Sequence, residues 1–225
     1  MNLRTRMIAV ASVAALLGAG CAQGPTLSFK DLPPHLGRSP CPGSEDLAPD
    51  PLPASAERSP RPAAHPWQPA GRRPWRYIVV HHSATADGNA CRFDRLHREV
   101  RGWDELGYHF VITNGRGGPD GAVEVGSRWV KQKWGAHCGG TPENAYNDYG
   151  IGICLVGDFR EQAPSAKQLA ALETLVAWLR NRWDIPADRV LGHGEAPNAA
   201  TACPGSELQA WLADYRQGAE ATAAR

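Results

Sequence analysis

The sequence predicts an α/β (α+β) domain with a central mixed β-sheet flanked by helices. Short β-branched runs alternate with segments whose apolar residues recur at helical spacing, and this interleaving is typical of a sheet covered by helices. The 225 residues, 42% of them apolar, are enough for one domain of ordinary size. A formal net charge of +1 argues against a protein that binds nucleic acid through phosphate contacts.

Five strands are predicted for this sheet. Tyr77 to His81 is a β-branched run bounded by Pro74 and Ser83, as expected for a short strand. The other predicted strands cover residues 108–112, 122–125, 151–156 and 190–192. The fourth of these is apolar throughout most of its length, so we expect it to be buried in the sheet.

Three helices are predicted between and after the strands. Residues 91–101 carry apolar side chains at helical spacing, and Gly102 ends the helix. Ser165 to Gln168 form a capping box, which opens a helix with one apolar face that must pack on the sheet. Ile185 and Pro186 end this helix, and a terminal helix is predicted over residues 207–215.

The first 20 residues have the features of an export signal. Two arginines precede the apolar run Met7 to Leu17, which is too short to span a bilayer and ends in small residues before Cys21. This ending resembles the cleavage box of bacterial lipoproteins, in which the cysteine is acylated, although Gly18 stands where leucine is more common. We expect a lipidated Cys21; ordinary signal cleavage is the alternative.

Residues 21–73 are predicted to form a disordered tether. Of the 19 prolines, 12 fall between Gln23 and Pro69, and proline interrupts both helix and sheet. We expect a passive spacer before a folded domain at 74–217, with a flexible tail at 218–225. The expected location is the cell envelope, lipid-anchored and facing the periplasm. Because Ala22 rather than aspartate follows Cys21, the outer membrane is expected in a Gram-negative cell.

A candidate metal site comes from residues at the ends of strands. His81 and His82 close the first strand, His193 follows the last, and Cys203 lies ten residues further on. Two imidazoles and one thiolate suit Zn²⁺, and sets of three protein ligands are typical of hydrolytic sites. Consecutive strand residues face opposite sides of a sheet, so His81 and His82 cannot both bind one metal. A purely structural histidine at a strand end is the alternative.

Four motifs occur together in the order found in one enzyme family. They lie at residues 78–84, 107–110, 146–153, and at Gly192-His193 followed by residues 201–205. Together they resemble the zinc-dependent N-acetylmuramoyl-L-alanine amidases of type 2, which include the peptidoglycan recognition proteins, from about Trp75 to Tyr215. The resemblance implies a single amidase domain that binds Zn²⁺ through His81, His193 and Cys203.

The resemblance also implies roles around the metal. It makes Tyr108 the catalytic hydroxyl and places Thr201 where some members carry a lysine that holds the oxyanion. Other members have a glutamate in the buried strand, where this chain has Cys154. His137 and Asn147 match segments that line the substrate groove, although a structural turn explains them almost as well.

The implied activity is hydrolysis of the amide between the lactyl group of N-acetylmuramic acid and L-alanine by zinc-activated water. The partners would be peptidoglycan or muropeptides and, through the lipid anchor, a membrane; we expect a monomer and no nucleic acid. A non-catalytic peptidoglycan-binding module and a structural zinc domain are the alternatives. Non-catalytic relatives commonly lack the residue at Cys203, and the motifs offer no fourth ligand, so we favour the enzyme.

The remaining polar and aromatic residues receive simpler interpretations. Cys91 and Cys138 are candidates for a disulfide, since exported proteins form them. His109 is expected to be a packed histidine with a satisfied ring, and His65 to be solvated in the tether. For three tryptophans core packing is the default and contact with sugar or peptide the alternative: Trp103, Trp129 and Trp134.

Overall fold

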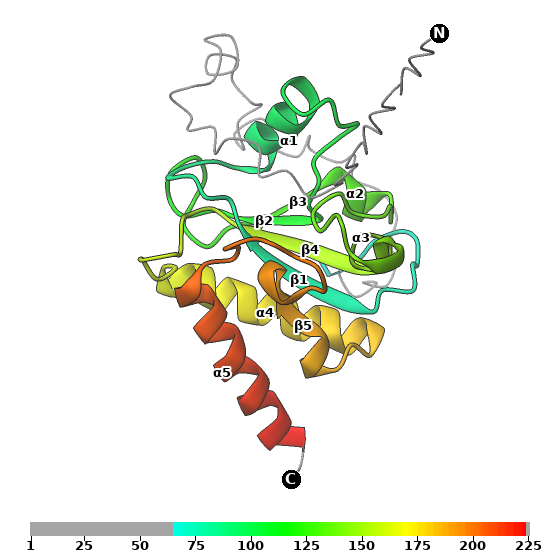
Figure 1. Cartoon of the computed structure of the whole chain (residues 1–225), viewed down its shortest axis with the longest axis vertical. Coiled ribbons are helices and arrows are strands. Elements are labelled where there is room, and N and C mark those ends of the chain that lie inside the picture. The colour runs from blue at the N-terminus through cyan, green and yellow to red at the C-terminus, as the bar shows by residue number, and fades with distance from the viewer. Residues whose placement is uncertain (1–64, 224–225) are drawn as a thin grey trace, which may run out of the picture.

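The computed structural model describes residues 65–223, and these form a mixed five-stranded sheet with the order β3-β2-β4-β1-β5 (Figure 1). Three pairs are parallel, β1 with β4, β1 with β5 and β2 with β4, whereas β3 runs antiparallel to β2. The strands are β1 (Tyr77–His82), β2 (Phe110–Ile112), β3 (Val123–Val125), β4 (Gly150–Leu155) and β5 (Val190–Gly192). The predicted mixed sheet is confirmed.

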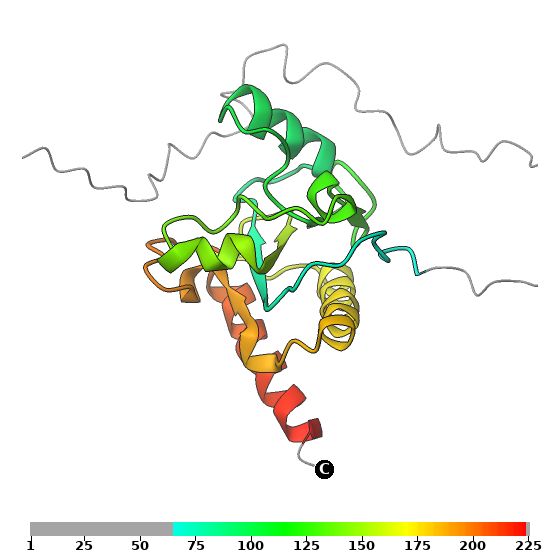
Figure 2. The ribbon, with the colours of Figure 1, turned by 90° about the vertical axis from the view of Figure 1, so that its right-hand side faces the viewer.

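Helices cover both faces of the sheet (Figures 1 and 2). The helices are α1 (Ala90–Glu99), α2 (Ser127–Val130), α3 (Ala145–Asp148), α4 (Ala166–Trp183) and α5 (Ser206–Ala223). Three short 3-10 turns are η3 (Pro142–Asn144), η4 (Ala187–Arg189) and η5 (His193–Glu195). Within residues 65–223, no helix combines the length and apolar character needed to cross a membrane.

The main core lies between one face of the sheet and helices α4 and α5. Alternate residues of the strands point to this face and are fully buried, in β4 for instance Ile151, Ile153 and Leu155. They pack against the apolar stripes of the two helices, made of Leu172, Leu175, Val176 and Leu179 in α4 and Leu208 and Leu212 in α5. The apolar face predicted for α4 therefore packs on the sheet as expected.

The predicted capping box opens α4. The Ser165 hydroxyl accepts a hydrogen bond from the Gln168 amide at 3.0 Å, and the Gln168 side chain accepts one from the Ser165 amide at 3.2 Å. The Gln168 side chain is also buried and donates to the carbonyls of Ile112 and Val156. The same residue thus caps the helix and ties it to the ends of β2 and β4.

Several element boundaries differ from the predictions. β2 begins only at Phe110, so Tyr108 and His109 precede the strand rather than lying in it. α5 continues to Ala223, so residues 218–223 of the expected tail are helical. The short helices α2 and α3 were not predicted, because four residues are too few to show an apolar period.

Contacts with the folded domain begin before the predicted boundary at residue 74. His65 is exposed, as expected, and its ring stacks on Trp178 of α4 with a centroid distance of 4.7 Å. The carbonyl of Trp67 accepts a hydrogen bond from the Trp129 indole at 2.8 Å, and that of Arg73 accepts one from the Trp183 indole at 3.0 Å. The expected disorder of residues 21–73 is therefore wrong for 65–73. The expected signal, Cys21 and the rest of the tether lie outside the described residues.

The predicted disulfide between Cys91 and Cys138 is wrong. Cys138 is a buried, reduced thiol that packs with Val79 and Leu191, whereas Cys91 is disulfide-bonded. Sequence spacing could not reveal this, because a disulfide requires Cα atoms within about 7 Å and only the fold sets that distance.

His109 is the packed histidine that the sequence suggested. Its ring is fully buried beside Trp75, at a centroid distance of 4.8 Å. Nδ1 accepts a hydrogen bond from the Gly152 amide at 2.9 Å, and Nε2 lies 3.0 Å from the Lys133 carbonyl, to which it donates. Only the neutral ring satisfies both partners, and burial lowers the pKa of His109 to about 4.

This depressed pKa predicts a loss of stability in acid. In the unfolded chain His109 takes up a proton near pH 6.5, whereas in the folded chain it does so only near pH 4. The stabilisation is therefore complete above pH 6.5 and falls between pH 6.5 and 4, by about 2–3 kcal/mol. Urea unfolding at pH 7.5 and at pH 4.5 measures the free energy of unfolding at each pH. In the His109→Gln variant, the decrease in this free energy between the two pH values should be smaller than in the wild type by this amount. Equal decreases in both proteins would contradict the assignment.

Candidate active site

The site lies on the face of the sheet opposite the main core. His81 is 1% exposed and is paired in register with Cys154 of the neighbouring strand β4. His82 points to the other face, where its Nδ1 accepts a hydrogen bond from the Phe159 amide at 3.3 Å. The alternation that predicted one ligand from this pair is therefore confirmed.

Two loops bring His193 and Cys203 next to His81. His193 follows β5 directly, and Cys203 lies in the loop that precedes α5. The Gly194 amide donates a hydrogen bond to the Cys203 carbonyl at 2.7 Å, which joins the two loops. Glu195 accepts from the Gly192 amide at 2.8 Å and pairs with Arg216 of α5 at 2.9 Å, so the His193 turn is anchored to the terminal helix.

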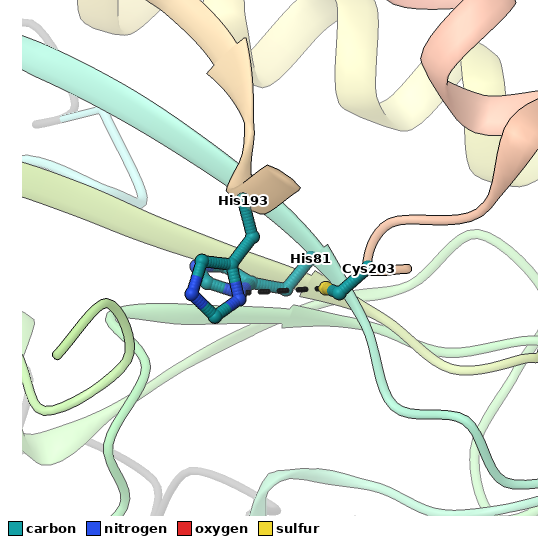
Figure 3. Close-up of side chains that lie close together, drawn as sticks. All are labelled: His81, His193 and Cys203. Carbon is teal, nitrogen blue, oxygen red and sulfur yellow. Dashed lines mark hydrogen bonds between the residues drawn. The ribbon is translucent and has the colours of Figure 1, made fainter. Parts of the chain in front are cut away.

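The three predicted ligands converge on one point (Figure 3). One ligand atom from each of His81, His193 and Cys203 can be chosen so that all three lie within 4.8 Å of one another. His81 Nδ1 lies 3.7 Å from the Cys203 sulfur. Zinc–nitrogen and zinc–sulfur bonds at a tetrahedral angle would separate these two atoms by about 3.6 Å. The donor set and its spacing therefore fit Zn²⁺.

Burial prepares the ligands in different ways. It lowers the pKa of His193 to about 4 and that of His81 well below its usual value, so both rings are neutral at pH 7 and keep a lone pair. Burial raises the pKa of the Cys203 thiol to about 12, although the His82 amide offsets this in part by donating to the sulfur at 3.4 Å. Metal binding at neutral pH would thus displace a proton from the thiol and none from the two rings.

Tyr108 lies beside the three ligands. Its ring centroid is 5.2 Å from that of His81 and 5.7 Å from that of His97. Its pKa is raised well above the usual value by burial and by the neighbouring Cys154 and Cys203. The phenol is therefore protonated at neutral pH and can act as a hydrogen-bond donor.

His137 and Asn147 are both buried and hydrogen-bonded within the protein. His137 Nδ1 lies 3.1 Å from Nε2 of His81. The Asn147 side-chain oxygen accepts from the amides of His137 and Cys138, both at 2.8 Å. These bonds give each residue an internal role, and a part in substrate binding stays a prediction.

The other predicted groups lie around this centre. The Thr201 hydroxyl accepts a hydrogen bond from the Cys203 amide at 3.1 Å, so Thr201 shapes the ligand loop; its role toward an oxyanion stays a prediction. Trp129 is a core residue, in line with the default expectation. Trp134 is 42% exposed, so core packing is wrong for that residue, and Trp103 packs on the His97 ring at 4.6 Å.

His97 is the residue of the site that sequence reasoning missed. It is buried on α1, its Nδ1 accepts from the Gly107 amide at 2.9 Å, and its ring packs against Tyr108. It therefore supports the loop that carries Tyr108. The available signal was its position four residues after Phe93, because these two are the buried residues of the helix.

Comparison with known proteins finds similar sequences among peptidoglycan recognition proteins and amidases. The peptidoglycan-recognition protein LB of Drosophila melanogaster is 32% identical over 149 residues, which cover 62% of this chain and 58% of that protein. Peptidoglycan recognition protein 1 of Bos indicus is 34% identical, covering 61% of this chain and 70% of that protein. An N-acetylmuramoyl-L-alanine amidase of Sus scrofa is 28% identical over 65% of this chain and only 26% of its own length.

Solved structures with the same fold come from both groups. The bumblebee peptidoglycan recognition protein SA matches with a TM-score of 0.51 and 31% identity, covering 63% of this chain and 81% of that one. The N-acetylmuramoyl-L-alanine amidase LysC from Clostridium intestinale matches with a TM-score of 0.50 and 28% identity, covering 60% of this chain and 78% of that one.

The match to the N-acetylmuramoyl-L-alanine amidase family covers residues 71–206. This range contains the whole sheet and all three residues that converge at the site. The chain therefore belongs to the type 2 N-acetylmuramoyl-L-alanine amidase and peptidoglycan recognition protein family.

Proposed function

We propose that the protein is a zinc-dependent N-acetylmuramoyl-L-alanine amidase. It would hydrolyse the amide between the lactyl group of N-acetylmuramic acid and L-alanine, in peptidoglycan or in muropeptides. The observation that carries the proposal is the convergence of His81, His193 and Cys203 within 4.8 Å, beside the protonated hydroxyl of Tyr108.

The ligand set favours catalysis over a purely structural site. Among residues 65–223 the group that can hold a metal comprises three side chains, and structural zinc sites use four. Zinc bound by these residues would supply an activated water and polarise the scissile carbonyl. His81, His193 and Cys203 would hold it from β1, from the turn after β5 and from the loop before α5.

Tyr108 is suited to stabilise the oxyanion formed from the scissile carbonyl. Its hydroxyl stays protonated because burial and the neighbouring thiols disfavour the phenolate. A protonated hydroxyl in a desolvated site donates a strong hydrogen bond to developing negative charge, without reorganising at the moment of reaction. Thr201, on the loop of Cys203, is a further candidate donor.

A recognition role without catalysis is the alternative, because several relatives are named as peptidoglycan recognition proteins. Binding requires only contacts with the substrate, whereas hydrolysis requires the metal ligands and Tyr108. The two functions are therefore separated by variants that remove one of these groups and leave the rest of the site in place.

Replacing Cys203 with serine should remove both metal binding and hydrolysis. Serine lacks the thiolate, so we expect zinc affinity to fall more than the roughly 10–100-fold cost of losing a group that only supports a ligand. Zinc content by mass spectrometry and product release from muramyl-peptide measure the two effects. The matched control is Cys138→Ser, a buried thiol outside the ligand set. Hydrolysis that persists in Cys203→Ser would defeat the thiolate assignment; wild-type protein that binds peptidoglycan without cutting it would support the recognition role.

Replacing Tyr108 with phenylalanine should slow the reaction and leave the metal in place. Loss of one donor to an oxyanion typically lowers kcat about 10²–10³-fold. We expect this decrease with unchanged zinc content and little change in KM. Tyr146→Phe provides the matched control, because Tyr146 packs on Tyr77 and is outside the ligand set. If Tyr108→Phe retained the wild-type kcat, the hydroxyl would have no catalytic role.

We also propose that the protein is held in the cell envelope by a lipid on Cys21, facing the periplasm. The sequence before Cys21 supports this proposal, and the residue lies outside the described residues. Cells fed a labelled fatty acid should label the wild-type chain and fractionate it with membranes. A Cys21→Ala variant should lose the label; label that persists would contradict the proposal.

A further inference from the structure

We propose that His137 is a positioning residue that fixes the orientation and the tautomer of the His81 ring. The inference rests on the proposed zinc site and assigns to His137 a role other than contact with substrate. It is carried by a line of hydrogen bonds that runs from the backbone of β4 through His137 to His81.

The line begins at a group that can only accept. The Gly150 carbonyl lies 3.2 Å from His137 Nε2, so this nitrogen must carry the proton of the neutral ring. Nδ1 of His137 is then the acceptor, and it lies 3.1 Å from Nε2 of His81. His81 therefore carries its proton on Nε2.

The consequence appears on the other side of the His81 ring. With the proton on Nε2, Nδ1 keeps its lone pair, and Nδ1 is the atom that faces the Cys203 sulfur at 3.7 Å. In the opposite tautomer, Nδ1 would point a proton at the position where a metal must bind. A partner that holds the second nitrogen of a ligand histidine both selects the tautomer and aims the ring.

The surrounding structure is built to hold the His137 ring. A Cβ added at Gly152 would lie 2.4 Å from the ring, and one added at Gly135 would lie equally close. The ring thus occupies the space left by two missing side chains, that of Gly152 on the site face of β4 and that of Gly135 in the loop after α2. Any larger residue at either position would displace it.

The backbone of His137 is held as firmly as its ring. The Asn147 side-chain oxygen accepts from the amides of His137 and Cys138, and the Asn147 nitrogen donates to Asn144 at 2.9 Å. Asn147 therefore acts on His137 through the backbone, and His137 acts on His81 through the ring. This assigns related positioning roles to two residues that the sequence suggested for substrate binding.

The test measures the zinc dissociation constant by competition with a chelator in wild type, His137→Leu and His137→Gln. Leucine fills space without a hydrogen bond, and we expect the constant to rise about 10–100-fold, as is typical when a group that orients a ligand is lost. The glutamine amide offers one acceptor and one donor, so we expect it to restore part of the affinity. In NMR spectra of the zinc-loaded protein, the slowly exchanging Nε2–H signal of His81 should be present in wild type and lost in His137→Leu.

His109→Gln is the matched control, because this buried histidine neighbours His137 and contacts no metal ligand. It should lower stability and leave the zinc dissociation constant unchanged. Wild-type affinity together with an intact His81 signal in His137→Leu would overturn the inference while leaving the zinc site standing. If the leucine variant does not fold, Gly152→Ala decides, since its Cβ displaces the ring: weakened zinc binding supports the inference and unchanged binding overturns it. A wild-type protein that binds no zinc would instead refute the proposed function.

Discussion

The site depends on an asymmetry between the two faces of β4. On one face the strand carries Ile151 and Ile153, which are fully buried in the main core. On the other face it carries two glycines, and the His137 ring fills the space above Gly152. Because side chains alternate along a strand, the same six residues can supply apolar side chains to the main core on one face and leave space for polar rings on the other face. The parallel pairing with β1 then places His81 beside this face of β4.

A polar cluster buried this deeply is costly unless each group has a partner. The His81 ring hydrogen-bonds the His137 ring, and the His137 ring hydrogen-bonds the Gly150 carbonyl. The Asn147 side chain accepts from the His137 amide, so each of these three buried polar residues has a partner. Burial has a chemical effect as well, because it keeps the imidazoles of His81 and His193 neutral and the phenol of Tyr108 protonated at pH 7. Desolvation therefore produces the protonation states that a metal site and an oxyanion donor require.

The opposite face of the sheet carries the features that hold the domain together. The segment that precedes β1 packs on α4 through Trp67, and tryptophan indoles donate hydrogen bonds to its backbone at Trp67 and Arg73. These two indole donors, Trp129 and Trp183, form one aromatic cluster with Trp67 and Trp178. The chain thus enters the domain on the side of α4, while the ligand residues converge on the other side of the sheet.

Patterns that depend on neighbouring residues could be recognised in the sequence alone. Alternation in β1, the capping box at Ser165 and the apolar face of α4 are local features, and each was confirmed. The ligand set of His81, His193 and Cys203 came from motif order, and the structure brings these three residues together. The choice of His81 over His82 followed from the geometry of a strand.

Features that depend on distant contacts were decided only by the tertiary structure. Cys138 is reduced and buried although its pairing with Cys91 suited an exported protein, because the fold alone determines which thiols can meet. The packing of Trp67 against α4 joins segments more than 100 residues apart, and no local pattern predicts it. The contact between His137 and His81 also joins residues that are far apart in the sequence. A motif shows that a residue belongs to a site, whereas only the folded chain shows which atoms it touches.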